Sequence, residues 1–233
     1  MNGLTHWLRR VPGLAPLVRR LRAALGGPAA QTFAGSADYW RQRYASGGDS
    51  GAGSYGKFAE FKARVINPLC DEFGLASVVE FGSGDGNQLK LLTMRDYLGV
   101  DISPEAVARC REMFAGVPGR RFLLAQDYAG EQADGAMSLD VIYHLVEDEA
   151  FDAYMRRLFA AARRCVIIYS SNRPADAADG LHVRHRVFTD WVAAQQPGWQ
   201  LARHVPNEHP FRGDWQTGSF ADFYIYTPKA PAP

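Results

Sequence analysis

The chain has 233 residues, of which 47% are hydrophobic and 22% are charged, with 26 Lys and Arg against 25 Asp and Glu. This composition excludes a disordered or collagen-like chain and indicates a globular domain with appendages. A net charge of +1 argues against a nucleic-acid partner, because phosphate binding requires an excess of clustered basic residues. Three scattered cysteines, Cys70, Cys110 and Cys165, favour a reducing, cytoplasmic compartment.

The positive charge is concentrated at the N-terminus. Residues 1–37 contain five arginines and no acidic residue, and the other 21 basic and 25 acidic residues give the rest of the chain a net charge of −4. Apolar residues at helical spacing, interrupted by Pro12 and Pro16, predict a basic amphipathic segment over residues 1–30. One interpretation is that this segment packs on its own domain or on a partner subunit. The other is that residues 1–25 bind peripherally to the inner face of the membrane. The sequence leaves both alternatives open.

Strands and helices alternate through the rest of the chain. The pattern predicts helices at 56–73, 87–94, 104–114, 146–164 and 189–195. Strands are predicted at 77–81, 97–100, 121–125, 136–140, 166–169, 199–205 and 219–227. This order predicts an α/β fold, a Rossmann-like three-layer sandwich with a mostly parallel seven-stranded sheet that ends in an antiparallel strand pair. The domain is expected to cover residues 31–228, followed by a flexible tail at 229–233.

A glycine-rich loop follows the first predicted strand, and residues 80–87 read EFGSGDGN. Its glycines allow a tight turn and a close approach of the backbone to a ligand. The loop departs from the dinucleotide fingerprint, because Asn87 stands where a third small residue is required. Its acidic residues, Glu80 and Asp85, suit a nucleoside with a cationic group better than a pyrophosphate.

Acidic residues also follow the second and third predicted strands. Asp101 lies 19 residues after Gly82, the spacing at which an acid reaches a ribose in this topology. Asp127 follows the third strand and is placed to accept from an adenine amino group. Each acid alone is also explained as a turn or cap residue. Together with the glycine loop they predict a nucleoside site at the carboxyl ends of the strands.

Residues 78–86, 98–101 and 126–127 resemble the successive motifs of class I S-adenosylmethionine (SAM)-dependent methyltransferases. The resemblance extends from about Tyr39 to Tyr226. It implies SAM as the cofactor and S-adenosylhomocysteine (SAH) as the product, with the glycine loop at the methionine part, Asp101 at the ribose and Asp127 at the adenine. The cofactor contacts predicted in this way are Tyr39, Arg43, Tyr55, Glu80, Gly82, Ser83, Gly84, Asp101, Ile102, Gln126, Asp127, Tyr128 and Asp140.

The segments before the first strand resemble those of bacterial methyltransferases that modify saccharides or small natural products. Residues 39–44 are aromatic and basic, and residues 47–56 are rich in glycine. The second segment is interpreted as a lid over the cofactor, with a flexible surface connection as the alternative. Arg43 is the predicted partner of the SAM carboxylate.

His144, after the fourth predicted strand, is the candidate general base, with Asp140 or a downstream acid orienting it. The alternative is a histidine that ties a loop together. The candidate substrate contacts share a late, polar part of the chain and are His182, Arg184, His185, His209 and Trp215. An ordinary polar surface explains them equally well. No metal is predicted, because no Cys or acid completes a ligand set around these histidines.

The leading hypothesis is therefore a SAM-dependent O-methyltransferase of a saccharide or glycoconjugate precursor, acting in polysaccharide biosynthesis. The alternatives are an N- or O-methyltransferase of a small natural product and a non-catalytic subunit with the same fold. A short-chain reductase is excluded, because none of the four lysines has a tyrosine four residues before it. The sequence does not predict which compound is the acceptor, which of its atoms is methylated, or the oligomeric state.

Overall fold

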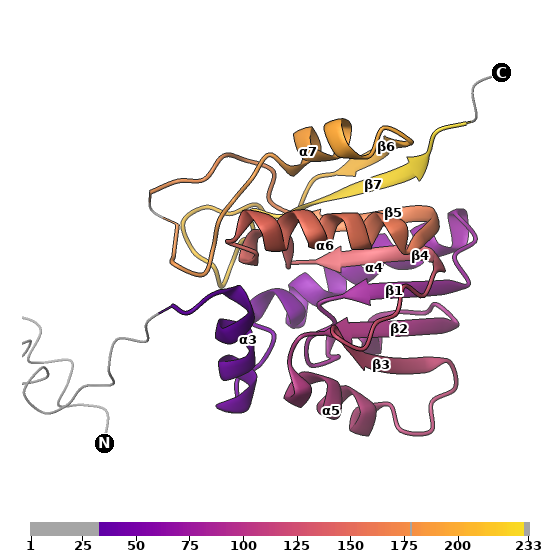
Figure 1. Cartoon of the computed structure of the whole chain (residues 1–233), viewed down its shortest axis with the longest axis horizontal. Helices are drawn as coiled ribbons and strands as arrows, with labels where there is room; N and C mark the ends of the chain where they lie inside the picture. The colour runs from indigo at the N-terminus through magenta and orange to yellow at the C-terminus, as the bar shows by residue number, and fades with distance from the viewer. Residues whose placement is uncertain (1–32, 178, 231–233) are drawn as a thin grey trace, which may run out of the picture. The chain divides into compact units, whose positions relative to one another are not determined.

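A seven-stranded sheet in the order β3-β2-β1-β4-β5-β7-β6 forms the centre of the computed structural model, which describes residues 33–177 and 179–230 (Figure 1). The strands are β1 (Ser77–Phe81), β2 (Asp96–Asp101), β3 (Arg120–Leu124), β4 (Ala133–Leu139), β5 (Ala162–Ser170), β6 (Trp199–Val205) and β7 (Asp222–Pro228). The first five strands pair in parallel, and β7 is antiparallel to both β5 and β6. This is the predicted topology.

Helices cover both faces of the sheet. The α-helices of the described chain are α3 (Ser36–Ala45), α4 (Gly56–Glu72), α5 (Pro104–Met113), α6 (Asp148–Ala160) and α7 (Phe188–Gln195). Short 3-10 turns are η2 (Ala52–Ser54), η3 (Gln88–Leu91) and η4 (Ile142–His144). Side chains of α4 and α5 pack on one face, and those of α6 and α7 pack on the other. The three-layer sandwich is therefore confirmed. Among the described residues, no helix is long and apolar enough to cross a membrane.

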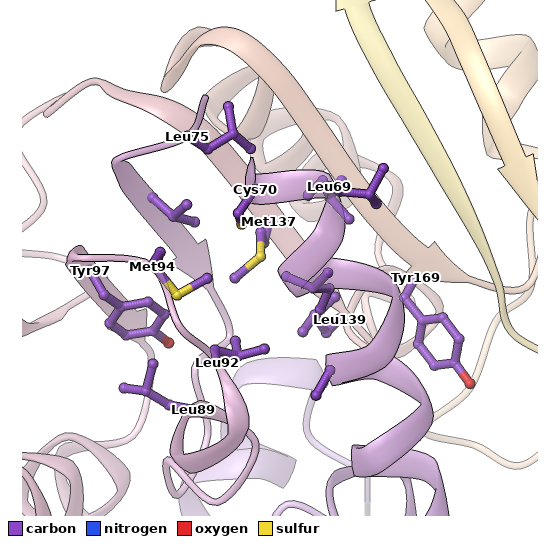
Figure 2. Packing of buried hydrophobic residues seen from close by; sticks show 14 of the residues in the cluster. Leu69, Cys70, Leu75, Leu89, Leu92, Met94, Tyr97, Met137, Leu139 and Tyr169 are labelled. Carbon is purple, nitrogen blue, oxygen red and sulfur yellow. The ribbon is translucent and has the colours of Figure 1, made fainter. Parts of the chain in front are cut away.

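The core on the α4 face is built from alternating strand residues and one stripe of the helix. Leu69 and Cys70 of α4 face Met137 and Leu139 of β4 (Figure 2). Met137 is completely buried. Since successive side chains of a strand point to opposite faces, Ala136 joins the second cluster, on the α6 face, and Ser138 hydrogen-bonds to Tyr154 of α6. This packing holds α4 against the strands whose ends form the site described below.

The predicted helix at 87–94 is wrong. The structure has only η3 there, and Leu92 is already extended. The Asn67 side chain of α4 donates to the Leu91 carbonyl and accepts from the Thr93 backbone N–H. These two bonds satisfy the backbone without further helical turns, so a long-range contact decides the end of the segment.

The N-terminal arm predicted over residues 1–30 lies outside the described residues, as does the end of the predicted tail, 231–233. The compact unit that contains the sheet begins at Ala34, just before α3. In Figure 1, α3 lies at the edge of the sheet toward which β1, β2 and β4 point. This helix therefore borders the region where ligands bind in open α/β sheets.

The burial of Met137 predicts a large loss of stability on truncation. Met137→Ala truncates a completely buried side chain and leaves a cavity in the core. We therefore expect the free energy of unfolding to fall by about 2–5 kcal/mol. Met113→Ala, at a position 42% exposed on α5, is the matched control and should change it by less than about 1 kcal/mol. Urea unfolding of both variants measures the difference, and equal losses would contradict the packing described above.

Candidate functional site

A cavity of about 460 Å³ lies at the carboxyl ends of β1, β2 and β4. Its floor is the glycine loop after β1, and its walls are the first turns of α3, the loop after β4 and one side of α6. Between β1 and β4 the chain order of the sheet reverses, which is the usual ligand position in this architecture. The fold therefore brings the predicted motifs to one site.

The glycine loop is shaped by the side chains around it. Gly82 and Gly84 have φ angles of 79° and 58°, and a Cβ atom on either would collide with Val141 or with Ser50. Asp101 at the end of β2 closes the loop by accepting from the Gly84 backbone N–H at 2.8 Å and from the Ser103 N–H at 2.9 Å. Burial raises the pKa of this carboxyl, against the lowering by those backbone N–H groups.

Two buried polar atoms on the cavity wall have no protein partner. They are Ser83 Oγ and Gln88 Oε1, while the Gln88 amide nitrogen donates to the Ala59 carbonyl. A buried polar atom without a partner costs roughly 1–3 kcal/mol, so such atoms are rare unless a ligand or water satisfies them. Both residues line the cavity, which adds polar side chains to its wall.

Asp85 ties the glycine-rich segment before α4 to the loop. It accepts from the Ser50 backbone N–H at 2.9 Å, from the Tyr55 hydroxyl at 2.7 Å and from the Asn87 N–H at 3.1 Å. Burial raises the pKa of Asp85, but these hydrogen bonds outweigh burial and hold it below the ordinary value. The segment interpreted as a lid therefore borders the cavity; its movement stays a prediction.

Glu80 is a buried acid at the end of β1. Its Oε2 accepts from the Tyr97 hydroxyl at 2.6 Å, and the residue lines the cavity. Burial raises the pKa of Glu80 to about 7, against the lowering by Tyr97 and by the charge of Lys62. The charge of this wall therefore changes near neutral pH.

Asp140, directly after β4, has a φ of 60° and is the one non-glycine residue with positive φ in the described part of the chain. Lys62 Nζ of α4 lies 2.8 Å from its Oδ2, and the Tyr143 hydroxyl donates to its Oδ1 at 2.9 Å. Backbone strain of this kind persists only where the surroundings hold it, and it is concentrated at functional sites. Both Lys62 and Asp140 line the cavity.

His144 also lines the cavity, in the turn after β4. Its Nδ1 lies 2.9 Å from the His182 carbonyl, and its ring packs edge-on against Trp40, with centroids 4.9 Å apart. Burial lowers the pKa of His144 to about 4, so the imidazole is neutral near pH 7. Asp140 or a downstream acid was predicted to orient this ring; in the structure Nδ1 lies beside the His182 carbonyl, and Asp140 binds Lys62 and Tyr143.

The predicted cofactor contacts fall into two groups. Those that line the cavity are Glu80, Gly82, Ser83, Gly84, Asp101, Ile102 and Asp140. Tyr39, Arg43, Tyr55, Gln126, Asp127 and Tyr128 do not line it.

The second group has other partners or positions. Arg43 binds the backbone and side chain of Asp49, so its predicted pairing with a ligand carboxylate is not supported by its position. Tyr55 binds Asp85, and Tyr128 donates to the Glu131 carbonyl. Gln126 and Asp127 are exposed, and the cavity wall ends at Ala125.

The predicted substrate contacts are less uniform. His185 is 2% exposed and does not line the cavity, and its ring nitrogens lie beside Ser171 and Asp179, so its position does not support the predicted substrate contact. Arg184 donates to the Val146 carbonyl at the start of α6. His182 stacks on Tyr39, and His209 packs against Phe58 and Phe61. Trp215 is 56% exposed and packs against Phe211.

The structure adds functional candidates that the sequence analysis missed, chiefly Lys62, Tyr143 and Trp40. Lys62 carried a usable signal, since it stands four residues after Phe58 and four before Ile66 on the buried stripe of α4. A lone charge on an apolar stripe needs a partner. Within the described residues, no group of three or more His, Cys, Asp or Glu side chains is placed to hold a metal ion.

Comparison with known proteins agrees with this geometry. The family model of a methyltransferase domain matches residues 79–167, from β1 to β5. No curated protein matches the sequence.

Solved structures share the fold at low sequence identity. Magnesium protoporphyrin IX methyltransferase from Synechocystis PCC 6803, with bound SAH, has a TM-score of 0.58 at 16% identity, covering 82% of this chain and 97% of that one. The methyltransferase domain of bacterial CtHen1-C has a TM-score of 0.57 at 20% identity, covering 73% and 98%. A SAM-dependent methyltransferase from Clostridium acetobutylicum ATCC 824 has a TM-score of 0.54 at 14% identity, covering 73% and 92%.

The fold and the matched domain define the class of protein. Residues 79–167 carry a methyltransferase domain, and the sheet is the mostly parallel seven-stranded sheet of the Rossmann-like methyltransferase fold. Residues 79–167 therefore match a methyltransferase domain, and the chain has the fold of SAM-dependent methyltransferases, in agreement with its sequence motifs.

Crowding at Gly82 is tested by comparison with a glycine in open space. Gly116 has nearly the same φ, 76°, but nothing within 4 Å of its Cβ position. We expect Gly116→Ala to cost about 1–2 kcal/mol of unfolding free energy through backbone strain alone. Gly82→Ala should cost about 1–3 kcal/mol more, because the new methyl group displaces Val141. Equal losses in urea unfolding would show that the loop has room for a side chain.

Proposed function

We propose that this protein transfers the methyl group of SAM to a hydroxyl group of a saccharide or glycoconjugate precursor. The observation that carries the proposal is the neutral, oriented His144 on the wall of a cavity whose residues fit SAM. Cofactor fit and acceptor chemistry are supported by separate groups of residues.

The cavity residues fit SAM in both charge and hydrogen bonding. Asp101 has acceptor capacity left for ribose hydroxyls, because a carboxylate accepts about four hydrogen bonds and two come from the backbone. Ser83 and Gln88 add polar side chains to the same wall. Glu80 adds negative charge toward a cationic ligand. When bound, SAM supplies an electrophilic methyl group, and the chain positions the acceptor and excludes water.

His144 is suited to take the proton of a hydroxyl acceptor. Its Nδ1 faces the His182 carbonyl, which favours the tautomer with the proton on Nδ1 and an acceptor lone pair on Nε2. A pKa of about 4 makes the imidazole a weak base. A weak base is sufficient, because the hydroxyl becomes strongly acidic as its oxygen bonds to the methyl carbon.

The proposal of a saccharide acceptor is supported by aromatic side chains in a loop at the same edge of the sheet. Trp215 and Phe211, on the loop between β6 and β7, form an exposed pair of tilted rings with centroids 4.2 Å apart. Such a pair presents an apolar surface of the kind on which a sugar ring or another flat acceptor packs. The similar structures include a magnesium protoporphyrin IX methyltransferase and a carbon methyltransferase. The fold alone therefore does not select the acceptor. The membrane contact of residues 1–25 likewise stays a prediction.

The pKa of Glu80 predicts that SAM affinity depends on pH. With a pKa of about 7, Glu80 is largely protonated at pH 6 and ionised at pH 8. A cationic ligand favours the ionised form, so binding releases a proton and the affinity should rise about tenfold from pH 6 to pH 8. Calorimetry in buffers of different ionisation enthalpy measures both quantities. Glu80→Gln is the control and should remove most of the pH dependence; an unchanged dependence would assign it to another group.

The base role of His144 predicts a loss of turnover without a loss of cofactor binding. His144→Gln should lower kcat about 10²–10⁴-fold and leave the SAH Kd within about threefold. His204→Gln, on exposed β6, is the matched control and should change neither. The acceptor is found by incubating the enzyme with labelled SAM and extracted glycans or metabolites, followed by mass spectrometry.

The pH profile gives a second readout for the same residue. Protonation of His144 should inactivate the wild-type enzyme with a limb near pH 4, not near the ordinary histidine pKa of 6.5. Unchanged turnover in His144→Gln would remove the histidine as base. If the enzyme methylates an amine or a planar natural product instead, the proposal of a saccharide acceptor is wrong.

A further inference from the structure

A buried ion pair lies where the chain order of the sheet reverses. Lys62 Nζ is 2.8 Å from Asp140 Oδ2, and the two side chains are 1% and 17% exposed. Desolvation makes a buried ion pair a poor source of stability, so its presence on a cavity wall calls for another reason. Lys62 has no counterpart among the residues predicted from the sequence motifs.

The ammonium group of Lys62 has unused hydrogen-bonding capacity. It carries three N–H donors, and within the described residues Asp140 is the hydrogen-bond acceptor found for it. The Tyr169 ring lies on another side, with its centroid 5.2 Å from Nζ. Since Lys62 lines the cavity, its remaining donors are available to a ligand bound there.

Asp140 has acceptor capacity left and is held in place. Lys62 and the Tyr143 hydroxyl each engage one of its oxygens, and a side chain at Gly53 would come within 2.7 Å of Oδ2. The backbone of the glycine-rich segment therefore approaches Asp140 closely at a position that leaves no room for a side chain. Glu80, on the neighbouring strand, adds a second acid to the same wall.

Other cations are poorly placed for an anionic ligand group at this point. Arg43 is bound to Asp49 and does not line the cavity. Arg157 lines the cavity from α6, where it reaches the Ala125 carbonyl at the end of β3. His144 is neutral near pH 7. Lys62 is therefore the cation beside the ends of β1 and β4.

We infer that the Lys62–Asp140 pair binds the zwitterionic amino-acid end of SAM, with Lys62 receiving the carboxylate and Asp140, together with Glu80, receiving the ammonium group. This inference rests on the proposed binding of SAM. In an α-amino acid the ammonium and carboxylate groups are attached to the same carbon. A cation and an anion 2.8 Å apart on the protein are therefore complementary to it. The charges of Lys62, Asp140 and the two ligand groups then alternate in sign, and the spare donors and acceptors of the pair are satisfied.

Binding of two ligands that differ only in this part tests the inference. SAH contains the amino-acid end, and 5′-methylthioadenosine lacks it. In calorimetry, Lys62→Met should weaken SAH binding at least tenfold and leave 5′-methylthioadenosine binding within about twofold. Lys57→Met is the matched control, because Lys57 lies on the same helix but donates to the Thr217 carbonyl at the surface. It should change neither affinity.

The outcomes separate the inference from the function beneath it. An unchanged SAH affinity in Lys62→Met, or an equal loss for both ligands, overturns the assignment of Lys62 while SAM binding stands. A wild-type protein that binds neither ligand overturns the proposed function and the inference with it. If Lys62→Met does not fold because Asp140 is left buried and unpaired, Lys62→Met/Asp140→Asn removes both charges. That double variant should show the same selective loss of SAH binding.

Discussion

Parallel pairing of β1 with both β2 and β4 is the constraint on which the site depends. It places the ends of three strands at one edge, so that the glycine loop, Asp101 and Asp140 meet although they are far apart in the sequence. The helix α4 packs on the same strands and carries Lys62 into the cavity. A shift of one strand by a residue would turn these side chains to the other face.

The charges that converge there are the second determinant of the site. Glu80 and Asp101 are buried acids, and each is stabilised by donors from neighbouring strands or loops. Their pKa values are raised by burial in spite of these donors. A cationic ligand relieves this cost, because it favours the ionised form of each acid. The mildly acidic body of the chain is therefore matched to a cationic cofactor by local geometry, not only by its net charge.

The strands and the glycine loop were predictable because their signals are local. Apolar runs that end at glycines or acids mark β1 and β2, and the observed bounds agree closely with the prediction. The helix at 87–94 was not predictable, because Asn67 from α4 ends it through contacts that no local pattern reveals. Arg43 was chosen for its charge and position in the chain, and only the folded segment pairs it with Asp49.

The sequence by itself determined the class of fold, the loop that forms the cavity floor and the acid at the end of β2. These follow from hydrophobic periodicity and from spacing along one chain. The tertiary structure decided which side chains share the cavity and which charge partners they have. It joined Lys62 to Asp140 across 78 residues and gave His144 its orientation from the His182 carbonyl. Such pairings depend on the packing of α4 and of the loop after β5 onto the sheet, which sequence spacing does not encode.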